Sequence, residues 1–409
     1  MKTLNVGVIG IGVIATTKHI PALLKREDVK ITAICDIDTA KAEKAKADLG
    51  LDAAVYADYK EVCTDPSIDV IHVCTPNPLH HPITMLALNN GKHVHCEKPL
   101  ALTYKDARAE LCGERRLGLI KYVMALMNGA RLGIGAQSVG LSQEAYNEAV
   151  AYAAERAQFG QKINRFPGVY DMLSRMKAKL DASRSLLYQT SRYVDVYKAL
   201  EDIQRERKLE PEERAEMKTF SRLADAFTPL CKGMSSEYAN QNAYDAISVH
   251  GGSGFIMEYK SQRLYRDARI FSIYEGTTQL QVVAAIRYIT NGTYLGIMNE
   301  MLQENVLPEL EPLKARVAKL VGIFSECVAK VREAGDSELQ DFLARRLYDM
   351  TGEIVMSLLL LRDATAAPEM FLKSAKVYCQ MACETVAGKS SYILDFDRES
   401  LPAFRVAED

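Results

Sequence analysis

The stretch LNVGVIGIGVIA at residues 4–15 decides the fold of the first part of the chain. A short apolar run, typical of a buried strand, leads directly into Gly10, Gly12 and Ala15, which fit the pattern G-x-G-x-x-G/A. The first glycine permits a tight turn, the second lets the main chain approach a pyrophosphate, and the small third residue lets a helix pack closely on the strand. The stretch therefore predicts a dinucleotide-binding turn, and a glycine-rich turn without a ligand is the alternative.

Strands and helices alternate from this turn to about residue 109. Further apolar runs predict strands at residues 29–35, 68–74 and 92–96, and amphipathic stretches predict helices at residues 17–25, 39–49 and 82–89. This alternation is typical of βαβ units in a parallel sheet. Asp36 follows the second strand, where a carboxylate accepts hydrogen bonds from an adenosine ribose. An acidic residue there favours NAD over NADP, because it repels a 2′-phosphate.

Two short segments follow the third and fourth strands. Thr75 and Pro76 come after the third strand, and Glu97 and Lys98 come after the fourth. Ligands of open α/β sheets bind at the carboxyl ends of the strands, so we expect cofactor contacts from Thr75, Pro76 and Glu97. With the glycine turn and the acidic strand end, the TPxxxH and EKP segments make residues 4–109 resemble the Gfo/Idh/MocA oxidoreductase family. The resemblance implies an NAD(P)-binding Rossmann domain.

The same resemblance implies a catalytic role for Lys98, near the nicotinamide and the substrate. An ammonium group there can hydrogen-bond a carbinol oxygen as hydride leaves. In that family the Rossmann domain continues through another helix and strand into an antiparallel sheet domain that carries a catalytic histidine. The sequence departs from this pattern after residue 108, so the Rossmann domain is truncated and neither His80 nor His81 is assigned that role. We expect no metal site, because the histidine spacing fits no zinc motif.

After residue 110 strand patterns nearly vanish and long helical patterns take over. Helices are predicted at residues 117–156, 167–203, 212–250, 278–294, 302–334, 338–364 and 368–387. Such lengths are typical of helical bundles. We therefore expect a multi-domain chain, with a truncated α/β Rossmann domain at residues 1–110, an all-α bundle at residues 111–290 and a helical extension at residues 291–409.

Two long blocks in this helical part resemble the C-terminal part of acyl-CoA dehydrogenases. They are residues 113–163, from GERRLGLIK to QFGQKI, and residues 250–281, HGGSGFIMEYKSQRLYRDARIFSIYEGTTQLQ. The resemblance implies FAD-dependent α,β-dehydrogenation of an acyl-CoA, in which a base takes a proton from the α-carbon while hydride leaves the β-carbon. Glu275 stands where the family carries that base. A carboxylate that only stabilises the start of a helix is the alternative for Glu275.

Further site residues are implied by the same resemblance. Arg131 aligns with a residue that meets the CoA portion of the substrate. The implied contacts to FAD are Arg156, Phe159, Gly160, Gly251, Gly252, Thr277 and Gln279. The element from Arg156 to Gly160 reaches the FAD of a neighbouring subunit in that family, which implies a homo-oligomer. An electron-transfer acceptor is the implied partner.

Composition narrows the functional classes further. The chain has 409 residues, 51 Lys and Arg against 53 Asp and Glu, and 48% hydrophobic residues. These values are typical of a globular protein and argue against a nucleic-acid binder. No apolar run reaches the length of a membrane helix, and the start does not fit a signal peptide. Nine cysteines without a CxxC pair indicate reduced thiols, so we expect a cytoplasmic protein.

The two resemblances meet at about residues 108–113 without a flexible linker. Acyl-CoA dehydrogenases carry a helical domain and a β domain before the bundle, and the Rossmann segment stands in their place. We therefore expect a chimeric junction, arising from gene modelling, assembly or splicing, and impaired catalysis; a new working combination is the alternative. Two other functions stay open: an NAD(P)-dependent sugar or polyol oxidoreductase, and a non-catalytic helical assembly module.

Overall fold

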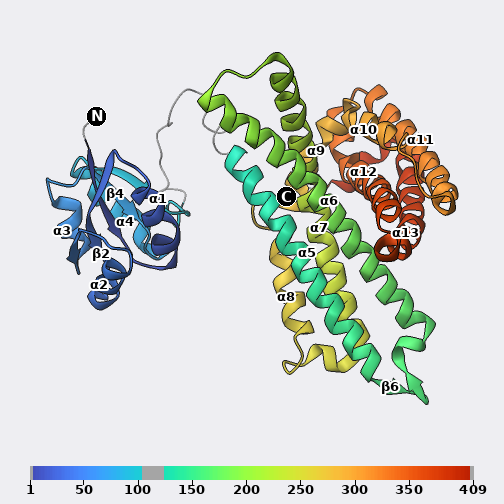
Figure 1. The fold of residues 1–409 in the computed structure, drawn as a ribbon, viewed down its shortest axis with the longest axis horizontal. Coiled ribbons are helices and arrows are strands. Elements are labelled where there is room, and N and C mark those ends of the chain that lie inside the picture. Colours follow the sequence, from blue (N-terminus) through green and yellow to red (C-terminus); the bar gives the residue numbers. More distant parts are fainter. Residues whose placement is uncertain (1–2, 104–123, 406–409) are drawn as a thin grey trace. The chain divides into compact units, whose positions relative to one another are not determined.

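The computed structural model describes residues 3–103 and 124–405. The chain divides into two compact units between residues 115 and 116, and each unit is described by itself (Figure 1). The junction that we predict near residue 110 lies outside the described residues. The division into three domains stays a prediction.

The first unit is a five-stranded parallel sheet with helices packed against it (Figure 1). The strand order is β3-β2-β1-β4-β5. The strands are β1 (Leu4–Ile9), β2 (Val29–Cys35), β3 (Ala54–Tyr56), β4 (Val70–Val73) and β5 (His93–Cys96). The helices are η1 (Ala15–His19), α1 (Ile20–Leu24), α2 (Thr39–Asp48), α3 (Tyr59–Thr64), η2 (Asn77–Leu79) and α4 (His80–Asn89). The predicted α/β fold is confirmed, with β3 and α3 as short additional elements.

Alternate residues of β1 enter two different cores on opposite faces of the sheet. Val6 and Val8 pack with Ala15 and Ile20 of the helices that follow the glycine turn. Ile9 belongs to the other core, on the side of α3 and α4. Burial on both faces explains why the strands read as apolar runs rather than as a strict alternation.

The second unit is built almost entirely from helices (Figure 1). They are α5 (Met124–Glu155), α6 (Pro167–Glu206), α7 (Pro211–His250), α8 (Ser261–Phe271), α9 (Thr278–Thr290), α10 (Thr293–Met301), α11 (Glu311–Glu333), α12 (Ser337–Ala366) and α13 (Pro368–Asp395). Short 3₁₀ segments are η4 (Ile163–Arg165), η5 (Gly251–Phe255), η6 (Pro308–Leu310) and η7 (Arg398–Phe404). A small hairpin, β6 (Ala157–Gln158) and β7 (Gln161–Lys162), lies between α5 and α6. The predicted all-α class of this part is confirmed.

The larger of two described hydrophobic cores in the second unit extends from α7 to α13, and a smaller one lies where α5, α6 and α7 meet α8. The larger core joins Phe227 of α7, Ile289 of α9, Phe324 of α11, Leu359 of α12 and Tyr378 of α13. The core is continuous across residue 290, where we place the start of the helical extension. The apolar run of α12 is buried in this core, and no described helix is long and apolar enough to cross a membrane.

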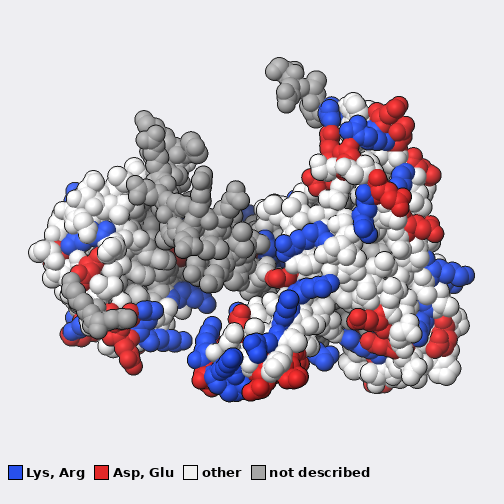
Figure 2. All heavy atoms as spheres, turned by 90° about the horizontal axis from the view of Figure 1, so that it is seen from above, with Lys and Arg blue, Asp and Glu red and all other residues white. Residues whose placement is uncertain are grey.

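The surface carries charges of both signs. In Figure 2, acidic and basic residues lie side by side on the visible face of the helical unit. Several of them form exposed ion pairs, such as Arg207 with Glu213 at the corner between α6 and α7. A surface of this kind contributes to solubility more than to stability.

Candidate functional sites

The loop between α8 and α9 holds Glu275 in an unusual backbone conformation. Glu275 has φ of 54°, in the left-handed region, and Gly276 follows with φ of 91°. A residue with a side chain is disfavoured there by about 1–2 kcal/mol. Such strain persists only where the surroundings fix it, and it concentrates at functional sites. The predicted base therefore sits at a position that the fold enforces at a cost.

Three buried side chains from three helices hold this loop through its main chain. Arg131 of α5 donates from Nε to the carbonyl oxygen of Glu275 at 3.3 Å. Lys232 of α7 donates from Nζ to the carbonyl oxygen of Gly276 at 2.7 Å, and Gln281 of α9 donates to the same oxygen at 2.9 Å. Arg131 is 6% exposed and Lys232 is fully buried. Two successive carbonyl groups are thus fixed from inside the bundle.

Arg131 and Lys232 also place two buried cationic side chains beside this loop. Burial and, to a smaller extent, the neighbouring Arg131 lower the pKa of Lys232 to about 8, while Glu237 and Glu275 oppose the shift. Burial also lowers the pKa of Arg131, against the charge of Glu275. The Glu275 side chain itself is partly exposed. A partly exposed carboxylate that interacts electrostatically with two buried cations is suited to proton exchange with a bound molecule.

The Arg131 guanidinium makes a second hydrogen bond within the protein. Besides Glu275 it donates from Nη1 to the Oδ1 of Asn128 at 3.2 Å. These bonds give Arg131 a positioning role that the sequence did not reveal. Its predicted contact with the CoA portion of a substrate stays a prediction.

The N-terminus of α9 follows Glu275 after two residues. The Thr277 hydroxyl caps the helix by accepting from the main-chain N–H of Leu280 at 3.4 Å, and Thr278 donates to the Oε1 of Glu237 at 2.6 Å. Thr277 and Gln279 are both exposed. An exposed helix start favours an anion or a ring oxygen, because the helix dipole is positive there. The structure thus brings Glu275, Thr277 and Gln279 together on one loop.

A second set of predicted residues lines a cavity of about 610 Å³. Arg156 and Phe159 reach it from the β6–β7 hairpin, and Gly251 and Gly252 reach it from the end of α7. Phe159 has φ of 46° and is 92% exposed. Gly251 has φ of 62°, and a side chain at Gly252 would meet no atom within 4 Å. An open glycine turn beside an exposed arginine offers space and a positive charge for a phosphorylated ligand.

Gly160 belongs to the same hairpin but lies outside the lining of this cavity. It has φ of 79° and forms the turn after Phe159. Residues of the loop around Glu275 are also absent from the described lining. The predicted FAD contacts therefore fall into two separate groups within the helical unit.

In the first unit, the glycine turn has the geometry that its motif predicts. Gly10 has φ of 90°, and a Cβ there would lie 2.8 Å from the main chain of Cys74 and Thr75. Its N–H donates to the carbonyl oxygen of Cys35 at 2.7 Å. A Cβ at Gly12 would meet nothing within 4 Å, and Ala15 is fully buried against the sheet. Gly10 is thus required by packing, whereas Gly12 leaves open space.

Asp36 ties the glycine turn to the end of β2. Its Oδ2 accepts from the N–H of Ile11 at 2.8 Å, and its Oδ1 accepts from the N–H of Asp38 at 3.1 Å. The Lys41 ammonium lies 3.5 Å from Oδ2. A cleft of about 430 Å³ is lined here by five predicted residues: Gly10, Gly12, Asp36, Thr75 and Pro76. The structure therefore collects these predicted NAD contacts at one edge of the sheet.

Glu97 and Lys98 lie after β5 and are not part of that lining. Glu97 binds His19, whose Nε2 lies 2.8 Å from Oε1, and this hydrogen bond lowers the pKa of Glu97. The Lys98 side chain is exposed, and its N–H donates to the Oε2 of Glu97 at 3.2 Å. Among the described residues, the Lys98 side chain is thus exposed to a ligand, whereas the Glu97 carboxylate binds His19.

His80 is a positioning residue that we did not assign from the sequence. It is buried, and its two ring nitrogens lie 2.7 Å from the carbonyl oxygens of Thr75 and Pro99. It therefore joins the segments that follow β4 and β5. The only sequence signal for this role was its place in the TPxxxH segment.

With the geometry described, comparison with known proteins identifies both parts of the chain. Residues 4–123 match the model "Oxidoreductase family, NAD-binding Rossmann fold". Residues 120–289 match "Acyl-CoA dehydrogenase, C-terminal domain", and residues 290–401 match "Acyl-CoA dehydrogenase C terminal". The chain therefore consists of oxidoreductase domains of two unrelated kinds. It joins a Gfo/Idh/MocA Rossmann domain to the C-terminal domains of the acyl-CoA dehydrogenase family.

Individual relatives divide in the same way. The caffeyl-CoA reductase–Etf complex subunit CarC of Acetobacterium woodii is 36% identical over 172 residues, 41% of this chain and 39% of that protein. The inositol 2-dehydrogenase/D-chiro-inositol 3-dehydrogenase of Lactiplantibacillus plantarum is 44% identical over 116 residues, 28% of this chain and 33% of that protein. The chain thus spans less than half the length of these relatives.

Among solved structures, an acyl-CoA dehydrogenase from Bacillus anthracis complexed with FAD superposes with a TM-score of 0.52. It shares 23% identity, and the match covers 69% of this chain and 51% of that one. This similarity shows the fold of the helical unit.

Proposed function

We propose that the helical unit carries out flavin-dependent oxidoreduction of an acyl-CoA, with Glu275 exchanging a proton with the α-carbon of the acyl group. The observation that supports this most is the strained backbone of Glu275, held by Arg131, Lys232 and Gln281. The φ alone gives no reason for a glutamate there, because a glycine would adopt the same φ at lower cost. A selected function for the carboxylate explains it.

The residues present fit FAD as the cofactor. Arg156 suits a pyrophosphate because a guanidinium binds two oxygens at once, and the open turn at Gly251 and Gly252 leaves room beside it. Thr277 and Gln279 offer a helix N-terminus to ring oxygens. When bound, the flavin supplies the hydride acceptor. The chain itself supplies the proton acceptor, Glu275, and holds it in place through its main chain.

A second copy of the chain would complete each flavin site. The residues that fit the cofactor form two separate groups, one around the cavity at Arg156 and one around Glu275. Next to the first group, Phe255 is 81% exposed and Met257 is 87% exposed. Large apolar side chains in a contiguous segment favour burial against a partner. We therefore propose a homo-oligomer in which Arg156 of one copy serves the flavin held by another.

The proposed electron acceptor is an electron-transferring flavoprotein. The relative from Acetobacterium woodii is named as a subunit of an Etf complex, which supports this choice. We also propose a cytoplasmic location, since all the cysteines that the structure describes are free thiols and most of them are buried.

Flavin loading tests the proposal directly. The full chain is incubated with excess FAD, separated from free FAD by gel filtration, and titrated anaerobically with butyryl-CoA. We expect a yellow protein whose flavin absorbance bleaches, and an Arg156→Leu variant with at least about tenfold weaker FAD binding. Arg266→Leu, at another exposed arginine of the unit, should bind FAD normally. A protein that stays colourless in excess FAD would overturn the proposal.

Binding of a nicotinamide dinucleotide by the first unit is the second candidate function. It is supported by the cleft that brings five predicted contact residues together. Lys98, exposed after β5, is the candidate proton donor and acceptor for a sugar or polyol hydroxyl in this alternative.

A further inference from the structure

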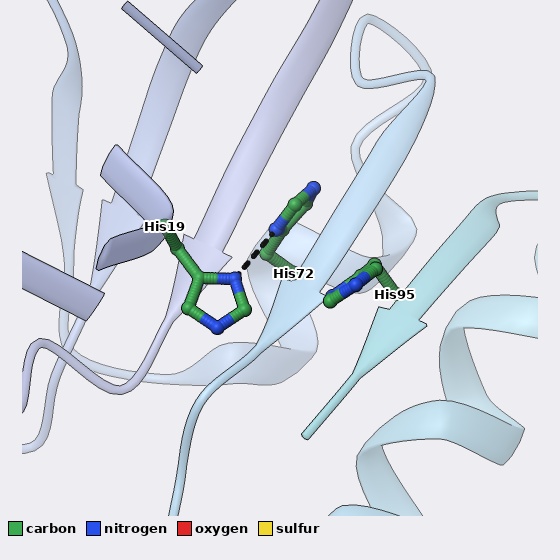
Figure 3. Close-up of side chains that lie close together, drawn as sticks. All are labelled: His19, His72 and His95. Carbon is green, nitrogen blue, oxygen red and sulfur yellow. Dashed lines mark hydrogen bonds between the residues drawn. The ribbon is translucent and has the colours of Figure 1, made fainter. Parts of the chain in front are cut away.

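Three histidines from three separate elements meet on one face of the sheet in the first unit (Figure 3). His72 of β4 and His95 of β5 are register partners, so their side chains point to the same face. Their rings stack with centroids 4.7 Å apart and an interplanar angle of 19°. His19, from η1, points toward them, and its Nδ1 lies 3.2 Å from the Nδ1 of His72. One ring nitrogen from each histidine lies within 4.8 Å of the other two.

A carboxylate fixes the orientation of one of these rings. The Nε2 of His19 lies 2.8 Å from the Oε1 of Glu97. Because an ionised carboxylate only accepts, Nε2 must carry the hydrogen of the neutral ring, and the lone pair lies on Nδ1. That lone pair faces His72. Histidines that bind metals show this arrangement, with one nitrogen on the metal and the other donating to a carboxylate.

We propose that His19, His72 and His95 bind a divalent transition-metal ion of the zinc type. Three imidazole nitrogens with a fourth position open to water are a known donor set for Zn²⁺ and Co²⁺. At a metal–nitrogen distance of about 2.0–2.1 Å, tetrahedral ligands lie roughly 3.3–3.4 Å apart. The pair formed by His19 and His72 already has nearly that spacing. His95 is exposed, so a small side-chain rotation brings its nitrogen to the ion.

Glu97 links this histidine cluster to the segment that follows β5. Glu97 also accepts from the N–H of Lys98 at 3.2 Å through its other oxygen. One carboxylate therefore connects His19 to the main chain of Lys98. An ion on the histidines would order the segment that carries Lys98.

The same geometry without an ion is a hydrogen bond between His19 and His72 beside a stacked ring. Cobalt binding distinguishes these states. Untagged full chain, treated with a chelator and dialysed, is titrated with Co²⁺ while visible absorption is recorded, and Zn²⁺ is then added in competition. We expect one Co²⁺ per chain with the intense bands of a tetrahedral ion, and their loss on addition of one equivalent of Zn²⁺.

Variants at exposed positions keep the test independent of folding. His95→Ala should abolish the bands, whereas His93→Ala, two residues earlier on the same strand, should retain them with affinity within about twofold. Glu97→Gln should weaken binding about 10- to 100-fold, because it removes the outer carboxylate. Circular dichroism of each variant confirms the fold. Absence of tetrahedral bands at millimolar Co²⁺, or equal loss in His93→Ala and His95→Ala, would overturn the proposal.

Discussion

Arg131 donates a hydrogen bond to the main-chain oxygen of Glu275, across 144 residues of sequence and from helix α5 to the loop between α8 and α9. This bond places a buried cation beside Glu275, whose φ of 54° lies in the left-handed region. The position of the proposed base is therefore set by a residue that does not need to touch the reacting atoms.

Removal of Arg131 should loosen this loop. Arg131→Leu leaves the carbonyl oxygen of Glu275 without its donor, so we expect the helical unit to lose about 1–3 kcal/mol of unfolding free energy. Chemical denaturation followed by far-UV circular dichroism measures the loss. Arg266→Leu is the exposed control and should change stability by less than about 0.5 kcal/mol. Equal stability of the two variants would contradict the proposed role of Arg131.

Relief of the backbone strain at Glu275 should stabilise the helical unit. Glu275→Gly should stabilise the helical unit by about 1 kcal/mol, because glycine adopts φ of 54° without a clash. Glu275→Gln keeps the side-chain bulk and the strain, so its thermal midpoint should remain that of the parent. Both variants lose the proposed base. A thermal midpoint of Glu275→Gly at or below that of Glu275→Gln would contradict backbone strain at this position.

Two glycines of the nucleotide turn should respond differently to substitution. Gly12→Val enters open space, so the first unit should stay folded while NADH binding weakens at least tenfold. Gly10→Ala should destabilise the first unit, because its Cβ would lie 2.8 Å from main-chain atoms at a φ of 90°. NADH fluorescence measures binding, and hydrogen exchange of β1 measures folding. Unchanged NADH binding by Gly12→Val would show that the cleft is not the binding site.

Lys232 should make stability depend on pH in the alkaline range. Its pKa in the folded chain is about 8, below the ordinary lysine value of 10.5, so between these values the unfolded state binds more protons than the folded state. Stability should therefore rise with pH from about 8 to 10.5, by up to about 1.4 kcal/mol per pH unit from this group. Because tyrosines of the unfolded state also titrate near pH 10, the difference from Lys232→Met at pH 7, 8 and 9 is the quantity to measure. A stability difference between the parent and Lys232→Met that is constant with pH would contradict a lowered pKa of Lys232.

The sequence predicted most of the architecture because its signals are local. Apolar runs marked four of the strands, periodic patterns marked the long helices, and the glycine motif placed Gly10 and Asp36 at one cleft. The three-residue strand β3 and the six-residue helix α3 are too short to show a period, so they were missed.

Contacts between residues that lie far apart in the sequence could not be predicted, because they depend on how the elements pack. His19 and His72 meet only because β1 and β4 are neighbours in the sheet, and His95 joins them only through the register of β4 with β5. No spacing motif encodes that arrangement. The same holds for the bond between Arg131 and Glu275, which depends on how α5 packs in the bundle. A glutamate before a glycine in a short loop was the one local sign of an unusual backbone.

The most direct test of the central claim is proton exchange at the acyl α-carbon, since it follows the base alone and needs no electron acceptor. The FAD-loaded full chain is incubated with butyryl-CoA in D₂O, and deuterium incorporation at the α-carbon is followed by mass spectrometry. We expect incorporation by the parent chain and a rate at least about 100-fold lower in Glu275→Gln. Equal rates for the two proteins, or no incorporation by FAD-loaded parent chain, would contradict the assignment of Glu275 as the base.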